Sequence, residues 1–210
     1  MKTGAPRFFR RSIFLAAAGI LAVVLTACTG RGGGYLPPDG VAFTGPALFG
    51  FTFSCERSSR STSTNPPTGR LRIQLAYTDQ GTSVLLGAPF SIHGIVDTIK
   101  PGDEWIESAI CIGQNPPPGD NVLIFLGRYR PTTSPPPGFP STCPTRETST
   151  SPLCRFEVEV HDNDRNLAPS QGDFFSIQLS STTILDDELT PGTVFYTRAG
   201  FLAGGNLTVK

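Results

Sequence analysis

RFEVEVHDND (residues 155–164) and GDFFSIQL (residues 172–179) are two runs in which apolar and polar side chains alternate. In the first run, Phe156, Val158 and Val160 project to one side of an extended chain, and the polar residues between them project to the other. The second run alternates in the same way. A period of two is typical of a half-buried strand, because successive side chains leave opposite faces of a sheet. The stretch therefore predicts two strands joined by a polar turn.

Runs of the same kind recur along the chain. We expect further strands within residues 41–55, 70–77, 83–99, 104–112, 121–129, 193–198 and 201–209. Gly204-Gly205-Asn206, between two apolar runs, predicts a tight turn. Long loops rich in Pro, Ser and Thr are expected at 56–69 and 131–152. No stretch keeps a helical period, so the chain is predicted to be all-β: an antiparallel β-sandwich or partly open barrel of about eight to ten strands.

The first 27 residues have the layout of a secretory signal. Lys2, Arg7, Arg10 and Arg11 form a positive region, and the apolar run of residues 13–25 is shorter than the ~20 residues of a membrane span. Leu25-Thr26-Ala27-Cys28 then resembles a bacterial lipobox. That resemblance implies cleavage before Cys28, acylation of its sulfur with chains such as palmitate, and attachment to the bacterial cell membrane or outer membrane. The rival interpretation is an ordinary signal peptide with a chance cysteine near its end.

This layout suggests three segments: a signal peptide at 1–27, a lipid-anchored flexible tether at 28–40, and a single β-sandwich-like domain at 41–210. The tether is predicted from its glycines and from Pro37-Pro38. Residues 28–210 carry 13 basic and 17 acidic side chains, a net charge of 13 − 17 = −4. Without a basic patch, nucleic acid is excluded as a partner. The expected partners are a membrane, through the anchor, and an envelope protein or glycan.

Four cysteines remain beyond Cys28. In an exported protein they suggest two disulfides. Cys143 and Cys154 flank one loop and are the expected pair, which leaves Cys55 with Cys111. Zinc is the alternative, but no Cys-x-x-Cys occurs and the chain has only two histidines.

A longer pattern runs through the C-terminal half: FxVxVxDN at 156–163, GDxFxIxL at 172–179 and YxxxGxLxGGNLxV at 196–209. It resembles post-COAP-1, an all-β accessory domain of secreted bacterial and archaeal surface proteins. The resemblance covers residues 49–209 and implies a β-sandwich-like module with no established catalytic residues. The cysteines, the Pro-rich insertions and Asp164-Arg165, where the family turns on glycine, depart from the pattern.

The densest cluster of oxygen ligands is Asp162, Asn163, Asp164 and Asp173. Calcium takes six to eight oxygens, often from Asp and Asn in a turn, so Asp162, Asp164 and Asp173 are a candidate calcium site. The alternative is turn chemistry, in which these side chains accept hydrogen bonds from the backbone of a hairpin. The same carboxylates would serve a calcium-dependent secreted hydrolase, which is the main enzymatic alternative.

Other candidate functional residues are weaker. Asp186-Asp187-Glu188 alternate in direction on an extended chain and are expected in a solvated loop. His93 and His161 lack a recognisable nucleophile motif, so no catalytic residue is assigned and we do not expect an enzyme. Trp105, Tyr129 and Phe139 are candidates for an aromatic sugar platform, against a role in the core. The sequence favours a structural or binding domain at the cell envelope.

Overall fold

The computed structural model describes residues 29–57, 69–81, 86–95, 122–148, 151–163, 172–184, 189 and 192–209. These residues form nine antiparallel strands and no helix, which confirms the predicted all-β class. The strands are β1 (Thr29–Leu36), β2 (Ala47–Arg57), β3 (Gly69–Asp79), β4 (Phe90–Ile95), β5 (Val122–Pro131), β6 (Cys154–His161), β7 (Phe174–Ser180), β8 (Val194–Phe201) and β9 (Gly204–Val209). The expected signal peptide, Cys28 and the expected strand at 104–112 lie outside the described residues.

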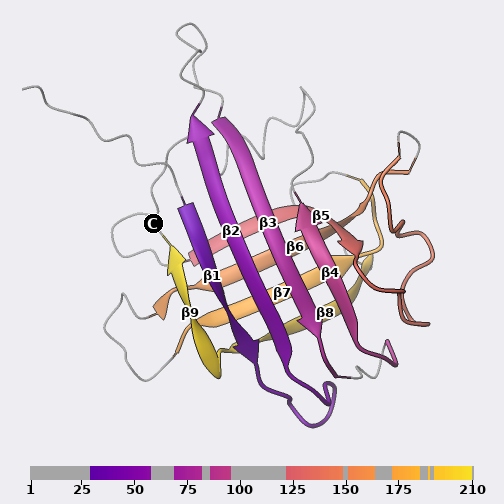
Figure 1. The fold of residues 1–210 in the computed structure, drawn as a ribbon, viewed down its shortest axis with the longest axis horizontal. Helices are drawn as coiled ribbons and strands as arrows, with labels where there is room; N and C mark the ends of the chain where they lie inside the picture. Colours follow the sequence, from indigo (N-terminus) through magenta and orange to yellow (C-terminus); the bar gives the residue numbers. More distant parts are fainter. Residues whose placement is uncertain are drawn as a thin grey trace, which may run out of the picture.

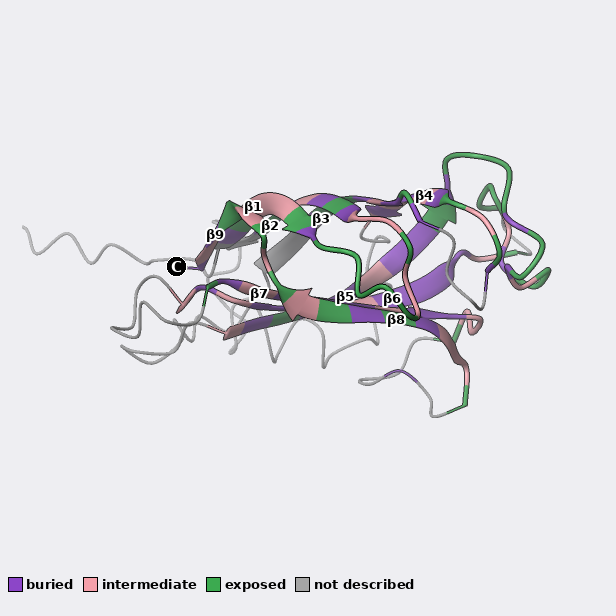
Figure 2. Ribbon diagram, turned by 90° about the horizontal axis from the view of Figure 1, so that it is seen from below, coloured by how far each residue is buried: buried purple, intermediate pink, exposed green. Residues whose placement is uncertain are grey.

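All nine strands belong to one sheet that curls into a half-barrel. Their order is β8-β7-β6-β5-β4-β3-β2-β1-β9. The sheet folds over between β4 and β5, so that β9 and β1–β4 form one layer and β5–β8 form the other. In Figure 1 the strands of the second layer cross behind the first at a steep angle. Figure 2 shows the two layers edge-on, with buried residues in the strands of both.

Two glycines allow the sheet to fold over. β4 and β5 pair at only four positions, and Gly94 and Gly127 lie at this corner. The ring of Phe156, which is fully buried, fills the space above both of them. A Cβ at either glycine would lie 2.6 Å from Phe156 Cε1. The absent side chains therefore make room for an aromatic ring at the tightest bend of the sheet.

The core between the layers is mostly aromatic. Phe49 of β2 stacks on Phe175 of β7 with ring centroids 3.7 Å apart, and Phe125 of β5 contacts Phe51 and Phe53 of β2. All five side chains are buried. Burying one such ring contributes about 1.5–3 kcal/mol. The inward-facing phenylalanines of β2 and Phe175 of β7 thus join the two layers.

Eight residues of the segment predicted as a flexible tether, residues 28–40, instead form a strand. Thr29–Leu36 forms β1 and pairs along its length with β2 on one side and with β9 on the other. A Cβ on Gly30 would lie 2.4 Å from Leu123 Cδ2, and one on Gly32 would lie 2.6 Å from Leu207 Cδ2. Leucines from neighbouring strands occupy the room that side chains here would need. The glycines therefore reflect close packing, and residues 29–36 belong to the sheet.

The C-terminal turn also differs from the prediction. Gly204, Gly205 and Asn206 are part of β9, and the chain turns just before them, at Leu202 and Ala203. β9 does not pair with β8, because the two strands lie at opposite edges of the sheet. Instead it pairs with β1 and runs across the ends of the second layer (Figure 1). This crossing places the last strand beside Asp162 and Asp173.

Candidate functional site

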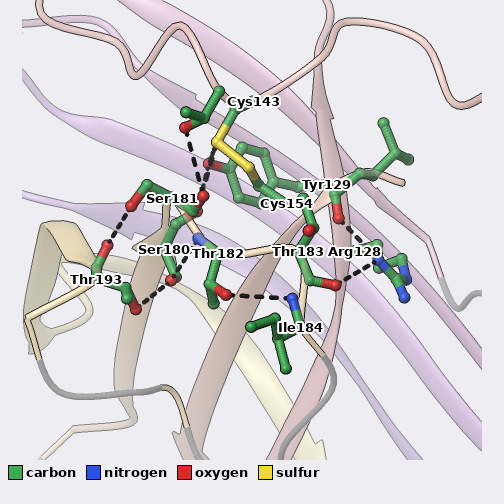
Figure 3. Close-up of a disulfide and its surroundings, with 12 residues drawn as sticks. Arg128, Tyr129, Cys143, Cys154, Ser180, Ser181, Thr182, Thr183, Ile184 and Thr193 are labelled. Carbon is green, nitrogen blue, oxygen red and sulfur yellow. Dashed lines mark hydrogen bonds between the residues drawn. A yellow bond between two sulfur atoms is a disulfide. The ribbon is translucent and has the colours of Figure 1, made fainter. Parts of the chain in front are cut away.

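A disulfide joins Cys143 to Cys154, as predicted from the sequence. Its sulfurs are 2.08 Å apart, and the two Cα atoms are 5.3 Å apart. It fastens the loop that follows β5 to the first residue of β6 (Figure 3). Both cysteines are buried, at 6% and 0% exposure, so the bond is shielded from small reductants. Cys111 lies outside the described residues, and the pairing of Cys55 with Cys111 stays a prediction.

Hydrogen bonds around the disulfide fix the same loop. Tyr129 donates its hydroxyl to the Ser180 carbonyl at 2.9 Å, and its oxygen lies 3.2 Å from Cys143 Sγ. Thr142 donates to the Ser181 carbonyl at 3.4 Å. Burial raises the pKa of Tyr129 well above its usual value, because the phenolate would lose its hydration. The loop is therefore tied both covalently and through the end of β7.

Two buried arginines hold a neighbouring segment, residues 181–184, across the outer side of β5 and β6. Arg128 and Arg155 are cross-strand partners. Arg128 Nη1 donates to the carbonyls of Leu153, at 2.9 Å, and Thr183, at 3.2 Å, while Arg155 Nη1 donates to the Ile184 carbonyl at 3.3 Å. Figure 3 shows Arg128 reaching these carbonyls beside the disulfide. These hydrogen bonds from the two arginines order residues 181–184, which belong to no strand.

An open groove of about 390 Å³ lies where the fastened loop meets the first layer. It is lined by the end of β3, the start of β4 and the chain just after β5: Thr78, Gln80, Pro89, Phe90, Ser91, Thr133 and Ser134. Thr78 Oγ1 and Ser91 Oγ are hydrogen-bonded at 2.9 Å. The exposed surface of the groove is mostly apolar, with a few hydroxyl and amide groups and no formal charge. It therefore suits a neutral ligand better than an ion.

Two carboxylates of the predicted calcium site, those of Asp162 and Asp173, accept hydrogen bonds from backbone amides. Asp173 Oδ1 accepts from Asn163 N at 3.1 Å, and its Oδ2 accepts from Leu207 N at 2.7 Å. Asp162 Oδ2 accepts from Val209 N at 3.0 Å. Both carboxylates are nearly buried, at 6% and 2% exposure. They therefore supply acceptors to N–H groups on the outer edge of β9, which has no strand beyond it.

This geometry supports the turn interpretation and extends it from the hairpin to the last strand. Asn163 and Asp173 do connect the ends of β6 and β7, as hairpin chemistry requires. Asp164, the third expected calcium ligand, lies outside the described residues. Within the part of the chain that the structure describes, no cluster of three or more His, Cys, Asp or Glu side chains is placed to hold a metal ion. The calcium site stays a prediction.

A second buried polar cluster was not singled out from the sequence. Asp79, at the end of β3, pairs with Arg198 of β8, with Oδ1 and Nη1 3.0 Å apart, in an orientation too oblique for a hydrogen bond. Tyr196 donates to Asp79 Oδ2 at 2.6 Å and also contacts the hydroxyl of Tyr77. Arg198 Nη2 donates to the carbonyls of Pro37 and Gly45. The cluster ties β8 to β3 and to the loop between β1 and β2.

Burial sets the chemistry of this cluster. It raises the pKa of both Tyr77 and Tyr196 far above the usual tyrosine value, and the neighbouring Asp79 carboxylate adds to the effect. Both hydroxyls therefore stay protonated and act as donors. Exposures of 3% or less for Asp79, Arg198 and both tyrosines leave no solvent-facing group for a substrate. The cluster is a structural bridge between the layers.

The remaining candidates fall into three groups. His161 Nε2 lies 2.6 Å from Glu159 Oε1, with both side chains on the outer side of β6. Tyr129 and Phe139 are buried in the core, at 0% and 8% exposure, so neither belongs to an exposed sugar platform. Trp105 and residues 186–188 lie outside the described residues. No part of the described chain forms a helix long and apolar enough to cross a bilayer.

Comparisons with known proteins found no match. No family model, no curated protein and no solved structure matches it. The resemblance to post-COAP-1 domains and the lipobox therefore stay predictions from the residues themselves. What the protein does must be argued from its own geometry.

Proposed function

We propose that this chain is a lipoprotein of the bacterial cell envelope whose β domain has a structural or binding role outside the cytoplasm. Leu25-Thr26-Ala27-Cys28 supports the lipid anchor, and the positive and apolar segments before it support export. The feature of the fold that best supports a location outside the cytoplasm is the buried Cys143–Cys154 disulfide. Structural disulfides belong to oxidising compartments and are rare in the cytosol.

The decisive experiment replaces the acceptor sulfur. In a bacterial host, the parent chain should incorporate a palmitate analogue and fractionate with membranes, and Cys28→Ser should lose the label and most of the membrane association. Two or three acyl chains are needed for stable anchoring, at ~0.8 kcal/mol per buried CH₂. Ala27→Gly keeps a small residue before the cysteine and is the matched control. A Cys28→Ser chain that fractionates like the parent contradicts the proposal.

The disulfide can be checked separately. Alkylation of the denatured, unreduced protein followed by peptide mass analysis should find the peptides of Cys143 and Cys154 joined. If both thiols are alkylated in protein taken directly from cells, the extracytoplasmic location is contradicted. This measurement does not depend on acylation, so it tests the location by itself.

The groove favours one specific binding role, recognition of a neutral glycan. Its mostly apolar surface can pack against the apolar face of a sugar ring, and the few polar groups of the lining, such as Gln80 and Ser91, can orient the sugar hydroxyls. Binding to a glycan array should weaken when Gln80→Ala and Ser91→Ala remove two of these groups. Thr197→Ala, at an exposed position of β8, should have no effect. If the glycan array gives no signal above that of an unrelated β domain, this role is refuted.

A further inference from the structure

The first strand begins directly after the proposed lipid-anchored residue. Thr29 already pairs with Ser54, and Gly30 pairs with Val209 on the other side. Residue 28 is one peptide away, and consecutive Cα atoms are about 3.8 Å apart. A flexible segment the length of Thr29–Gly40 would instead span about 20 Å on average. An acyl group on Cys28 is therefore attached almost directly to a paired strand.

From this we propose that the domain stands on the membrane in one orientation, with the end of the first layer that contains Thr29 against the lipid head groups. The inference rests on the proposed acylation of Cys28 and adds an interaction surface to it. A chain anchored through a long tether would sample all orientations, whereas one anchored at the start of a paired strand cannot turn that end away. The occupant of this surface is the bilayer that holds the acyl chains.

By sequence, the strand positions at this end are rich in arginine, which anionic lipid head groups attract. Arg31 is exposed on β1. The same end of β2 and β3 holds the backbone of Glu56, Arg57, Arg70 and Arg72. The described strand positions here thus contribute four arginines and one glutamate. Anionic head groups attract basic residues near their surface by about 1 kcal/mol each.

The opposite end of the layer would face away from the membrane. Leu36, Ala47, Asp79 and Phe90 are paired neighbours at that end, seven positions along β1 from Thr29. At about 3.3 Å per residue, the two ends are roughly 23 Å apart. The groove lined by Gln80 and Ser91 lies at this far end. The orientation would therefore present the groove to the solvent, clear of the head groups.

Two fluorescent probes test the orientation in the acylated full-length protein reconstituted in anionic vesicles. A fluorescent amino acid is placed at Thr52, exposed and paired with Arg31, or at Gln80, exposed at the far end. A short-range quencher is attached to the lipid head groups. Quenching of the probe at Thr52 should be several-fold stronger than that at Gln80. Because no thiol chemistry is used, the native cysteines are undisturbed.

The matched control inserts a Gly/Ser linker, as long as Thr29–Gly40, between Cys28 and Thr29. Its average span of about 20 Å frees the domain to rotate, so the difference between the probes should disappear. Equal quenching of both probes without the linker, in protein shown by mass to be acylated and by sedimentation to be vesicle-bound, overturns the orientation alone. A chain that carries no acyl group overturns the proposed anchor and the orientation with it.

Discussion

Asp173 should contribute more to stability than its place in a turn suggests, because its two oxygens hold two different parts of the chain. Oδ1 accepts from Asn163 N at 3.1 Å, and Oδ2 accepts from Leu207 N at 2.7 Å. In Asp173→Asn, only one carboxamide oxygen is left, and the amide nitrogen faces one of the two N–H donors. A buried backbone N–H then loses its acceptor.

The magnitude follows from these two contacts. A hydrogen bond to a charged group contributes about 1.5–3 kcal/mol, and an orphaned buried donor costs about 1–3 kcal/mol. Since one of the two bonds can survive, we expect a net loss of about 2–4 kcal/mol. At roughly 2–4 °C per kcal/mol for a domain of this size, the melting temperature should fall by roughly 5–15 °C. The protection of β9 amides should fall as well as the stability of the whole domain, because β9 is an edge strand with a neighbouring strand on one side only.

Two measurements separate the local and global effects. Thermal unfolding gives the global loss, with Glu147→Gln as a control that removes an exposed carboxylate. Native-state hydrogen exchange should show the amides of Leu207 and Val209 exchanging faster in Asp173→Asn, with the amide of Phe125 little changed. An unchanged melting temperature and unchanged exchange would refute the reasoning.

Calcium provides a second route to refutation. If Asp173 only binds amides, millimolar calcium and chelator should leave the melting temperature of the parent unchanged. A rise with calcium that is lost in Asp173→Asn would show that the carboxylate is a metal ligand. That result would support the calcium site predicted from the sequence. It would contradict the view that Asp173 only holds the backbone of β9.

Three other perturbations test other parts of the fold. The free energy of unfolding should fall above about pH 10, by up to ~1.4 kcal/mol per pH unit for each buried tyrosine, because a folded-state tyrosine with a raised pKa keeps its proton while the unfolded chain loses it. Tyr129→Phe should make this pH dependence less steep in urea titrations, and an unchanged slope would contradict the reasoning. Gly127→Ala should cost about 1–3 kcal/mol, measured by urea unfolding, because its Cβ meets the Phe156 ring, whereas Gly50→Ala, with no atom nearer than 3.9 Å, should cost less; equal costs would rule out the crowding argument. Replacing Cys143 and Cys154 together by serine should cost about 2–3 kcal/mol for a crosslink that spans 11 residues, and no loss would mean that the hydrogen bonds alone fix the loop.

Alternation along the chain was enough to predict most of the strands and the face that each of these buries. Phe49, Phe51 and Phe53 point inward from β2, as do Phe175, Ile177 and Leu179 from β7. The Cys143–Cys154 bond was also predictable, because two cysteines that flank one loop are near each other in any compact fold. These features depend on residues close together in the sequence, where the period and the spacing carry the information.

The glycine-rich segment at 29–36 shows where such reasoning stops. Its composition is that of a linker, and no local signal separates a linker from a strand whose side-chain space is filled by Leu123 and Leu207. The same holds for Gly204 and Gly205, which suit a tight turn but lie in a strand that pairs with β1. In both cases the deciding contacts come from residues far away in the chain.

The role of the polar residues was likewise decided by tertiary structure. Asp162 and Asp173 could be read from the sequence as metal ligands or as turn residues, and only the crossing of β9 places Val209 and Leu207 amides in front of them. Asp79 and Arg198 are 119 positions apart and meet only because the sheet folds over at β4 and β5. Local periodicity and spacing were enough for most of the strands, their buried faces and one disulfide, because these depend on residues close together in the chain. The strand order, the corner and the partners of the buried charges required the folded chain, because they depend on contacts between distant segments.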